Sequence, residues 1–171
     1  MYTEFEKMAD HSKVWIYQSG TVLSESQKNI IEQNTKQFLS QWTAHNMALL
    51  ASFKIVNNHF LIISVDEDIA NASGCSVDGL FRHIQSLETG LHLSLLNRAE
   101  IAYEEAGNIH ISTLNSIPEL IRKKIVREDT YIYNNTVQKK YELETHWRVP
   151  ASASWLKRYF VLENENVASN S

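Results

Sequence analysis

The segment Ala72-Ser73-Gly74-Cys75-Ser76-Val77-Asp78-Gly79 decides how the middle of the chain folds. It holds the only cysteine and two of the five glycines among 171 residues. An apolar run that ends in acids precedes it, from 61 to 68. Apolar residues recur after it at helical spacing: Val77, Leu80, Phe81, Ile84, Leu87 and Leu91. The pattern predicts a β-strand, a tight corner and an amphipathic helix.

Cys75, at the corner, has two interpretations. Backbone N–H groups at a helix start favour negative charge and would stabilise a thiolate nucleophile, with His45 or His59 as its base. Against this, Asp78 in the first helical turn would oppose a thiolate, and free cysteines are commonly buried as small apolar residues. We therefore expect Cys75 to be buried and structural, next to a Gly74 that the backbone shape requires.

Outward from the corner, strands and helices alternate. The run 14–17 predicts a first strand, and Ser24 with Gln27 forms a capping box for a helix that ends near Ala44, where His45 would cap it. Two apolar runs joined by Asn57-Asn58-His59 predict a hairpin, and two more strands follow at 99–103 and 109–112. This β-α-β-β-α-β order predicts the α+β class and a ferredoxin-like fold, a split β-α-β antiparallel sheet with helices on one face.

The C-terminal third adds further elements to this core. Ser116 and Glu119 have capping-box spacing before a third, short helix over 117–125, and 131–133 predicts a last strand. Beyond it the chain is irregular but rich in apolar anchors: Val137, Tyr141, Leu143, Trp147, Val149, Trp155, Tyr159 and Phe160. We expect this tail to wrap over the domain, although its aromatic residues could also line a groove. The predicted organisation is an N-terminal extension over 1–12, a single α+β domain over 13–162 and a disordered tail over 163–171.

Composition disfavours several functional classes. The formal net charge is −4, and basic residues occur only as short doublets, so we expect no nucleic-acid binding. One cysteine allows no internal disulfide, which fits a reducing compartment. No apolar run approaches the roughly 20 residues of a membrane span, and the N-terminus lacks a signal-peptide pattern. We expect a cytoplasmic protein with no membrane span.

Several short motifs carry a resemblance to a known family: Val14-Trp15-Ile16-Tyr17-Gln18-Ser19, Trp42-Thr43-Ala44-His45-Asn46, Val65-Asp66-Glu67, the corner 72–78, Tyr133-Asn134-Asn135, and Trp147 with Val149-Pro150 and Ser154-Trp155. On these motifs the chain resembles a family of short, uncharacterised bacterial proteins that often carry the label "ABC transporter ATPase". The family has no established activity, so the resemblance implies kinship only. The label conflicts with the chemistry, since a phosphate loop (Walker A motif) ends in Gly-Lys-Ser/Thr and this chain has no Gly-Lys pair.

The remaining polar residues support two functional hypotheses. Asp66 and Glu67 at a strand end could act as a base or as magnesium ligands, but we favour a solubilising loop. No Cys-x-x-Cys or His-Glu-x-x-His spacing occurs, so we expect no metal and no cofactor. We predict a non-catalytic interaction or ligand-binding domain for an unidentified protein or small molecule. The alternative is a small enzyme that uses Cys75. The candidate binding residues are Asp66, Glu67, Ser73, Gly74, Ser76 and Asp78.

Overall fold

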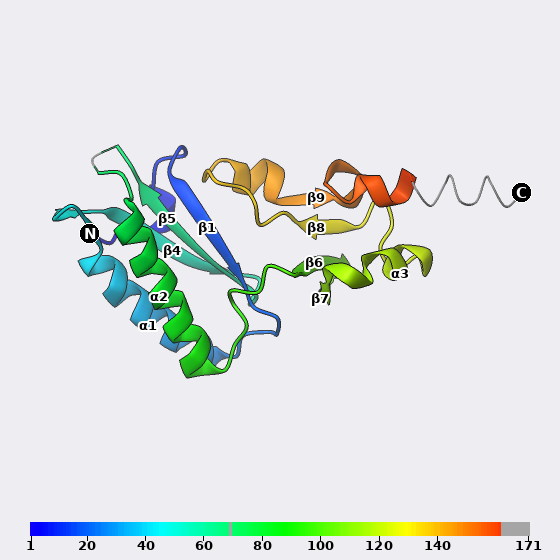
Figure 1. Cartoon of the computed structure of the whole chain (residues 1–171), viewed down its shortest axis with the longest axis horizontal. Helices are drawn as coiled ribbons and strands as arrows, with labels where there is room; N and C mark the ends of the chain where they lie inside the picture. The colour runs from blue at the N-terminus through cyan, green and yellow to red at the C-terminus, as the bar shows by residue number, and fades with distance from the viewer. Residues whose placement is uncertain (69, 162–171) are drawn as a thin grey trace, which may run out of the picture. The chain divides into compact units, whose positions relative to one another are not determined.

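The computed structural model describes residues 1–68 and 70–161, so the tail predicted over 163–171 lies outside the described residues. Helices combine with antiparallel sheets, which confirms the α+β class (Figure 1). Contacts divide the chain into two compact units, whereas the sequence predicts a single domain over 13–162. Unit 1 comprises Met1–Asn97 and Asn135–Glu142. Among the described residues, unit 2 comprises Arg98–Asn134 and 143–161.

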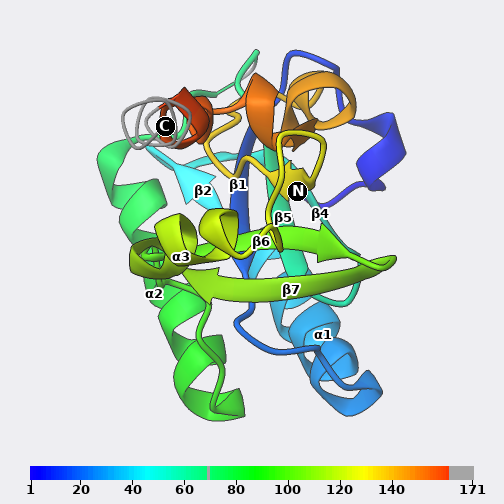
Figure 2. The ribbon, with the colours of Figure 1, turned by 90° about the vertical axis from the view of Figure 1, so that its right-hand side faces the viewer.

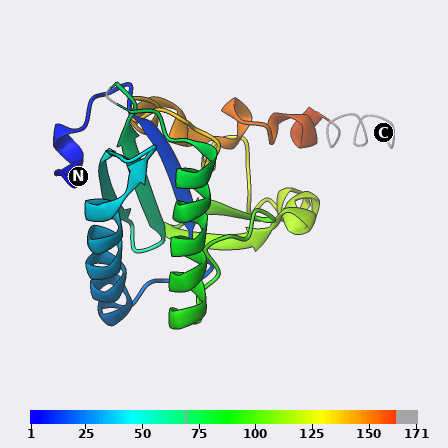
Figure 3. The ribbon, with the colours of Figure 1, turned by 60° about the vertical axis from the view of Figure 1, so that its left-hand side comes forward.

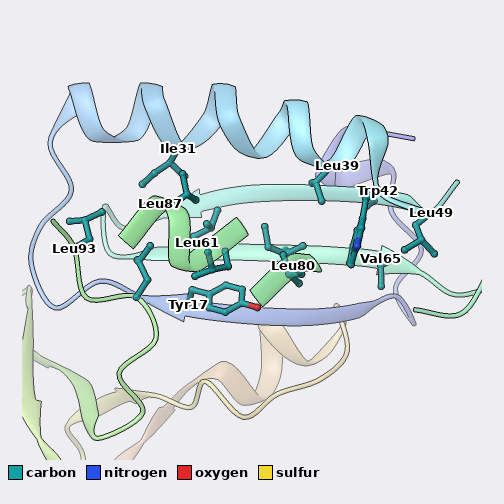
Figure 4. Packing of buried hydrophobic residues seen from close by; sticks show 14 of the residues in the cluster. Tyr17, Ile31, Leu39, Trp42, Leu49, Leu61, Val65, Leu80, Leu87 and Leu93 are labelled. Carbon is teal, nitrogen blue, oxygen red and sulfur yellow. The ribbon is translucent and has the colours of Figure 1, made fainter. Parts of the chain in front are cut away.

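A three-stranded antiparallel sheet forms the centre of unit 1, in the order β1 (Lys13–Gln18), β5 (Phe60–Asp66), β4 (Leu50–Val56). Only the last residue of β5 is not fully buried, as its central position requires. Helices α1 (Glu25–Gln41) and α2 (Gly74–Leu91) lie side by side on one face of the sheet (Figure 3). The core lies between these two layers (Figure 4), and its fully buried members include Ile31, Leu39, Leu61, Ile63, Leu80 and Ile84.

The start of α1 confirms the predicted capping box, but the end of the helix differs. Gln27 N–H donates to Ser24 Oγ (3.2 Å), and Ser24 N–H donates to Gln27 Oε1 (2.9 Å). The helix ends at Gln41, and a small hairpin follows, β2 (Thr43–Ala44) with β3 (Met47–Ala48). His45 and Asn46 form its turn at φ 50° and 65°. The capping role predicted for His45 was wrong, because two successive positive φ values make a hairpin turn.

The hairpin predicted from Asn57-Asn58-His59 is confirmed. It joins β4 to β5, with Val56 opposite Phe60, and both asparagines have positive φ, 53° and 54°. Asparagine tolerates this left-handed conformation better than most residues, which explains its place in the turn.

The fourth strand expected in this sheet is elsewhere. The predicted strand at 99–103 forms β6 (Glu100–Glu105), which pairs with strands of unit 2 and not with β1. The edge of β1 is instead covered by the returning segment 135–142. Val14 N–H donates to Gln138 O (2.8 Å), and Lys140 N–H donates to Ser12 O (2.9 Å). Lys13 and Lys139 form an antiparallel bridge between these two bonds.

The N-terminal extension is part of unit 1. Tyr2 makes a parallel bridge to Ala51 of β4, and a single 3-10 turn, η1 (Phe5–Lys7), follows. Phe5 and Met8 are buried, and Lys54 Nζ lies 4.3 Å from the centre of the Phe5 ring. The extension therefore packs against β4 and contributes side chains to the folded unit.

Unit 2 contains a four-stranded antiparallel sheet in the order β7 (Asn108–Thr113), β6, β8 (Tyr131–Tyr133), β9 (Arg148–Pro150). Figure 2 shows the β6–β7 hairpin with α3 (Ile117–Arg122) beside it. The 3-10 turn η2 (Leu114–Ser116) precedes α3. The capping box predicted at Ser116 is absent: Ser116 Oγ donates to Thr113 O (2.7 Å), and the helix ends three residues earlier than predicted.

The predicted tail supplies both a strand and core side chains to unit 2. After the single π-helical turn η3 (Leu143–Trp147) come β9, the 3-10 turn η4 (Ala151–Ala153) and a short helix over 157–161. Trp147, Leu156 and Phe160 are buried, whereas Trp155 is 40% exposed. The core of unit 2 consists of Ile101, Tyr103, Ile117, Ile121, Val126, Ile132, Ala151, Leu156 and Phe160.

An ion pair crosses the sheet of unit 2. Arg148 of β9 donates to both carboxylate oxygens of Glu104 on β6, at 2.6 and 2.7 Å, and the Tyr133 hydroxyl donates to the same carboxylate (2.8 Å). The guanidinium hydrogen bond holds the pKa of Glu104 below its ordinary value. These bonds fix β9 to β6 across the intervening β8.

Candidate functional site

The corner from Ser73 to Gly79 joins a strand to a helix, as predicted. Ser73 is the N-cap residue of α2, and Ser76 is buried with its hydroxyl donating to Ser73 O (2.8 Å). Trp42 Nε1 donates to Ser76 O (2.9 Å), which fixes the first turn of α2 to the end of α1. Leu80, Ile84 and Leu87 of the predicted stripe are buried, but Phe81 is 49% exposed. The hydrogen bonds of both serines therefore serve the helix start.

The expectation of a buried Cys75 was wrong, because the side chain is exposed. In the described part of the chain, residues 1–68 and 70–161, no hydrogen bond or ion pair involves its sulfur. Asp78 is exposed one turn further along the helix. The position thus lacks the partner that would orient an activated nucleophile.

We expect Cys75→Ser to leave the free energy of unfolding within about 0.5 kcal/mol of the parent, as is usual for exposed positions. The wild-type thiol should react with a maleimide in the folded protein. Urea denaturation and a labelling time course check the two statements. A thiol that reacts only after unfolding would contradict the exposed position.

The requirement for glycine at position 74 was also wrong. Gly74 is the first residue of α2, its φ is not positive, and a Cβ built on it meets nothing within 4 Å. Neither backbone conformation nor packing therefore excludes a side chain there.

Gly74→Ala is expected to raise the free energy of unfolding by about 0.4 to 1 kcal/mol, because alanine loses less conformational entropy on folding. Gly107→Ala is the matched control: Gly107 has φ +79°, so the same change should destabilise by more than about 1 kcal/mol. Urea denaturation of both variants gives the comparison. A loss of stability in Gly74→Ala would show that the corner needs glycine after all.

The two histidines proposed as bases are placed differently. His59 is buried at the start of β5, with its Nδ1 3.2 Å from Ser19 O. This seven-residue strand extends about 20 Å from His59 at 3.3 Å per residue, and Cys75 follows in the chain after its other end, which does not favour His59 as the base. His45 lies in the exposed β2–β3 turn, and β2 contacts α2. His45 therefore lies on an element that contacts the helix bearing Cys75.

The acidic residues after β5 meet a histidine that sequence reasoning missed. His11 Nε2 lies 2.9 and 3.0 Å from the two carboxylate oxygens of Asp68 and 3.9 Å from Asp66 Oδ1. One ligand atom from each residue falls within a group 4.8 Å across, so the three could hold a divalent cation. Glu67 instead accepts from Ala72 N–H (3.1 Å), which orders the corner loop. Because 57 residues separate His11 from Asp68, no local spacing reveals the cluster.

His83 lies between the two helices of unit 1. Its ring stacks on Phe38, with ring centres 4.5 Å apart, and its Nε2 lies 3.1 Å from the Oγ1 of the buried Thr35. Burial lowers the pKa of His83 from 6.5 to about 4. The fold therefore favours the neutral imidazole.

This lowered pKa predicts acid sensitivity. The pKa of His83 is lower in the folded protein than in the unfolded chain. The contribution of the neutral His83 to the free energy of unfolding is therefore fully present above pH 6.5 and is lost as the pH falls toward 4. Because His83 is partly exposed to solvent, the free energy of unfolding should fall by only about 1 to 2 kcal/mol over this range. His83→Gln cannot titrate and should flatten this part of the stability–pH curve, measured by urea denaturation. An unchanged slope in His83→Gln would contradict the assignment.

A groove in unit 1 is a concave feature with a mixed aromatic and charged lining. It has a volume of about 500 Å³ and lies between α1 and the edge strand β4. Its lining residues are Tyr2, Glu32, Gln33, Lys36, Phe53, Lys54 and Ile55. Tyr2 and Phe53 have ring centres 5.8 Å apart, and Lys36 Nζ lies 5.2 Å from the centre of the Tyr2 ring. Burial, followed by the charges of Glu4 and Glu32, raises the pKa of Tyr2, so its hydroxyl stays protonated at neutral pH.

None of the binding residues predicted at the corner lines this groove. The groove combines an aromatic surface with two lysines, a composition suited to a ligand with an apolar and an anionic part. Comparison with family models, with curated proteins and with solved structures gives no match. Within residues 1–68 and 70–161, no helix is both long enough and apolar enough to cross a membrane.

Proposed function

We propose that the protein is a non-catalytic binding domain whose ligand occupies the groove between α1 and β4. The observation that carries the proposal is the groove itself, because its volume of about 500 Å³ falls within the 300–1,000 Å³ that is usual for ligand sites. The apolar part of a ligand would lie on Tyr2, Phe53 and Ile55. An anionic part would lie near Lys36 or Lys54.

A binding role also agrees with the surroundings of Cys75. Its sulfur has no hydrogen-bond partner in the described chain, and the buried His59 lies at the far end of β5. The enzyme hypothesis therefore has less support than the groove.

The proposal includes three expectations from the sequence. We propose that unit 1 is a variant of the ferredoxin-like arrangement in which the segment 135–142 takes the place of the fourth strand, since it bonds to the β1 edge where that strand would pair. We also propose kinship with the bacterial family that the motifs resemble, without ATP hydrolysis. A single, unpaired cysteine supports a cytoplasmic location.

Nuclear magnetic resonance titration with a panel of small aromatic carboxylates tests the groove. The expected result is a saturable change of amide shifts at Gln33, Lys36 and residues 53–55. Phe53→Ala should weaken this binding at least fivefold, because it removes part of the aromatic surface. Phe81→Ala removes an exposed phenylalanine outside the groove and should leave the affinity unchanged. Shifts that gather at residues 66–78 instead, or no saturable shift at all, would overturn the proposal.

A further inference from the structure

The backbone of β4 shows which of its polar groups face away from the sheet. In an antiparallel pair, successive residues direct their N–H and C=O groups to alternate sides. Ala51 directs its groups away from β5: its N–H donates to Met1 O (3.0 Å), and its C=O accepts from Thr3 N–H (3.1 Å). Phe53 and Ile55 follow at intervals of two, so their N–H and C=O groups point to the same outer side.

The N-terminal segment covers only the first part of this edge. A parallel ladder that continued past Ala51 would place Thr3 O on the N–H of Phe53. Instead, Ser52 Oγ donates to Thr3 O (2.7 Å), and the chain then enters η1. In the described part of the chain, no strand pairs with the outer side of β4 beyond Ala51. Phe53 and Ile55 therefore present an open length of strand edge, about 10 Å long at 3.3 Å per residue.

The groove lies beside this open edge. Phe53, Lys54 and Ile55 form one wall, and Glu32, Gln33 and Lys36 of α1 form the other. A strand added to β4 would lie 4.7–4.9 Å from it and would direct alternate side chains toward α1. Lys36 lies on the α1 wall of the groove, its Nζ is 5.2 Å from the centre of the Tyr2 ring, and it makes no ion pair within the described residues. This unpaired cation favours an acidic side chain in the occupant.

We propose that the ligand is an extended, acidic peptide segment that adds as a strand to β4 at Phe53–Ile55. The inference rests on the proposed function and specifies its ligand. Backbone hydrogen bonds to Phe53 and Ile55 hold the main chain, as in other cases of strand addition. An apolar side chain of the peptide packs on Tyr2 and Phe53. The carboxylate of an acidic side chain of the peptide pairs with Lys36.

The probe is a synthetic seven-residue peptide of alternating threonine and valine with a central glutamate, and its control has a central lysine. Titration at low salt should shift the amides of Phe53 and Ile55, and the glutamate peptide should bind at least fivefold more tightly. Lys36→Glu should reverse this preference. Arg82→Glu, an equal charge change on the exposed surface of α2, should retain it.

Ile55→Pro tests the backbone bonds. The N–H of Ile55 points away from β5, so proline removes the docking donor without removing a ladder bond, and edge strands tolerate such a proline. Ile55→Ala loses the same side-chain packing but keeps the N–H. We expect Ile55→Pro to bind the glutamate peptide at least tenfold more weakly than Ile55→Ala, with both variants shown to be folded by their amide spectra.

The outcomes separate this inference from the proposed function. Equal peptide affinity of the two Ile55 variants, or the absence of peptide binding to the wild type, would overturn strand addition. The groove proposal would survive either result if aromatic carboxylates still shift the groove amides. Loss of both responses would overturn both.

Discussion

Ending the chain at Glu142 is expected to unfold unit 2. The deletion removes β9 together with Trp147, Leu156 and Phe160, which are all buried. Truncating even one large core side chain costs about 2 to 5 kcal/mol, and a typical domain is stable by only about 5 to 15 kcal/mol. The amide spectrum of β6, β7 and β8 should lose its dispersion.

A chain that ends at residue 161 is the control for this truncation, because it keeps every described residue of unit 2. It should retain the parent spectrum and a cooperative thermal transition. If the chain ending at Glu142 kept the parent shifts in β6–β8, the tail would not belong to the core. Its apolar residues would then serve a partner, which is the alternative left open by the sequence.

Trp42→Ala is expected to be the most damaging single substitution in unit 1, at about 3 to 5 kcal/mol. The indole is buried, contacts the rings of Trp15 and Phe38, and donates to Ser76 O. It thus connects the end of α1 to the start of α2, and its removal leaves a cavity where the layers meet.

Trp42→Phe distinguishes the contribution of the buried ring from that of the indole hydrogen bond. Phenylalanine keeps most of the buried aromatic volume, so the free energy of unfolding should fall less than in Trp42→Ala, with about 1 kcal/mol attributable to the hydrogen bond. Trp155→Ala removes a tryptophan that is 40% exposed and should cost less than Trp42→Ala. Urea denaturation followed by circular dichroism measures all three. Equal losses for Trp42→Ala and Trp155→Ala would contradict the role of burial.

Local patterns predicted the parts of the fold that depend on near neighbours. The Ser24–Gln27 capping box forms between residues three apart, and Asn57 with Asn58 adopts the positive φ of its own turn. The segment that covers the outer edge of β1 could not be predicted in this way. The hydrogen bonds of Gln138 and Lys140 to this edge join residues more than 100 positions apart. Periodicity identifies a strand but does not identify its neighbour.

The candidate site was harder to predict than the fold for the same reason. Tyr2 comes from the extension that the sequence places outside the domain, Lys36 comes from α1, and Phe53 comes from β4. None of them belongs to a motif with fixed spacing. A lone cysteine and two glycines made the corner around Cys75 a candidate site in the sequence. In the structure, neither Cys75 nor Gly74 is constrained by packing.

The return of 135–142 to unit 1 has a consequence for the newborn chain on the ribosome. The N–H of Val14 cannot pair with Gln138 O until Gln138 has been synthesised. At about 5 to 20 residues per second, the interval between the synthesis of these two residues is roughly 6 to 25 s. Until then the nascent polypeptide displays an unprotected strand edge, which invites pairing with other chains. Aggregation during translation should therefore depend on elongation speed between these two points, and slow codons placed there should lower the yield of native protein.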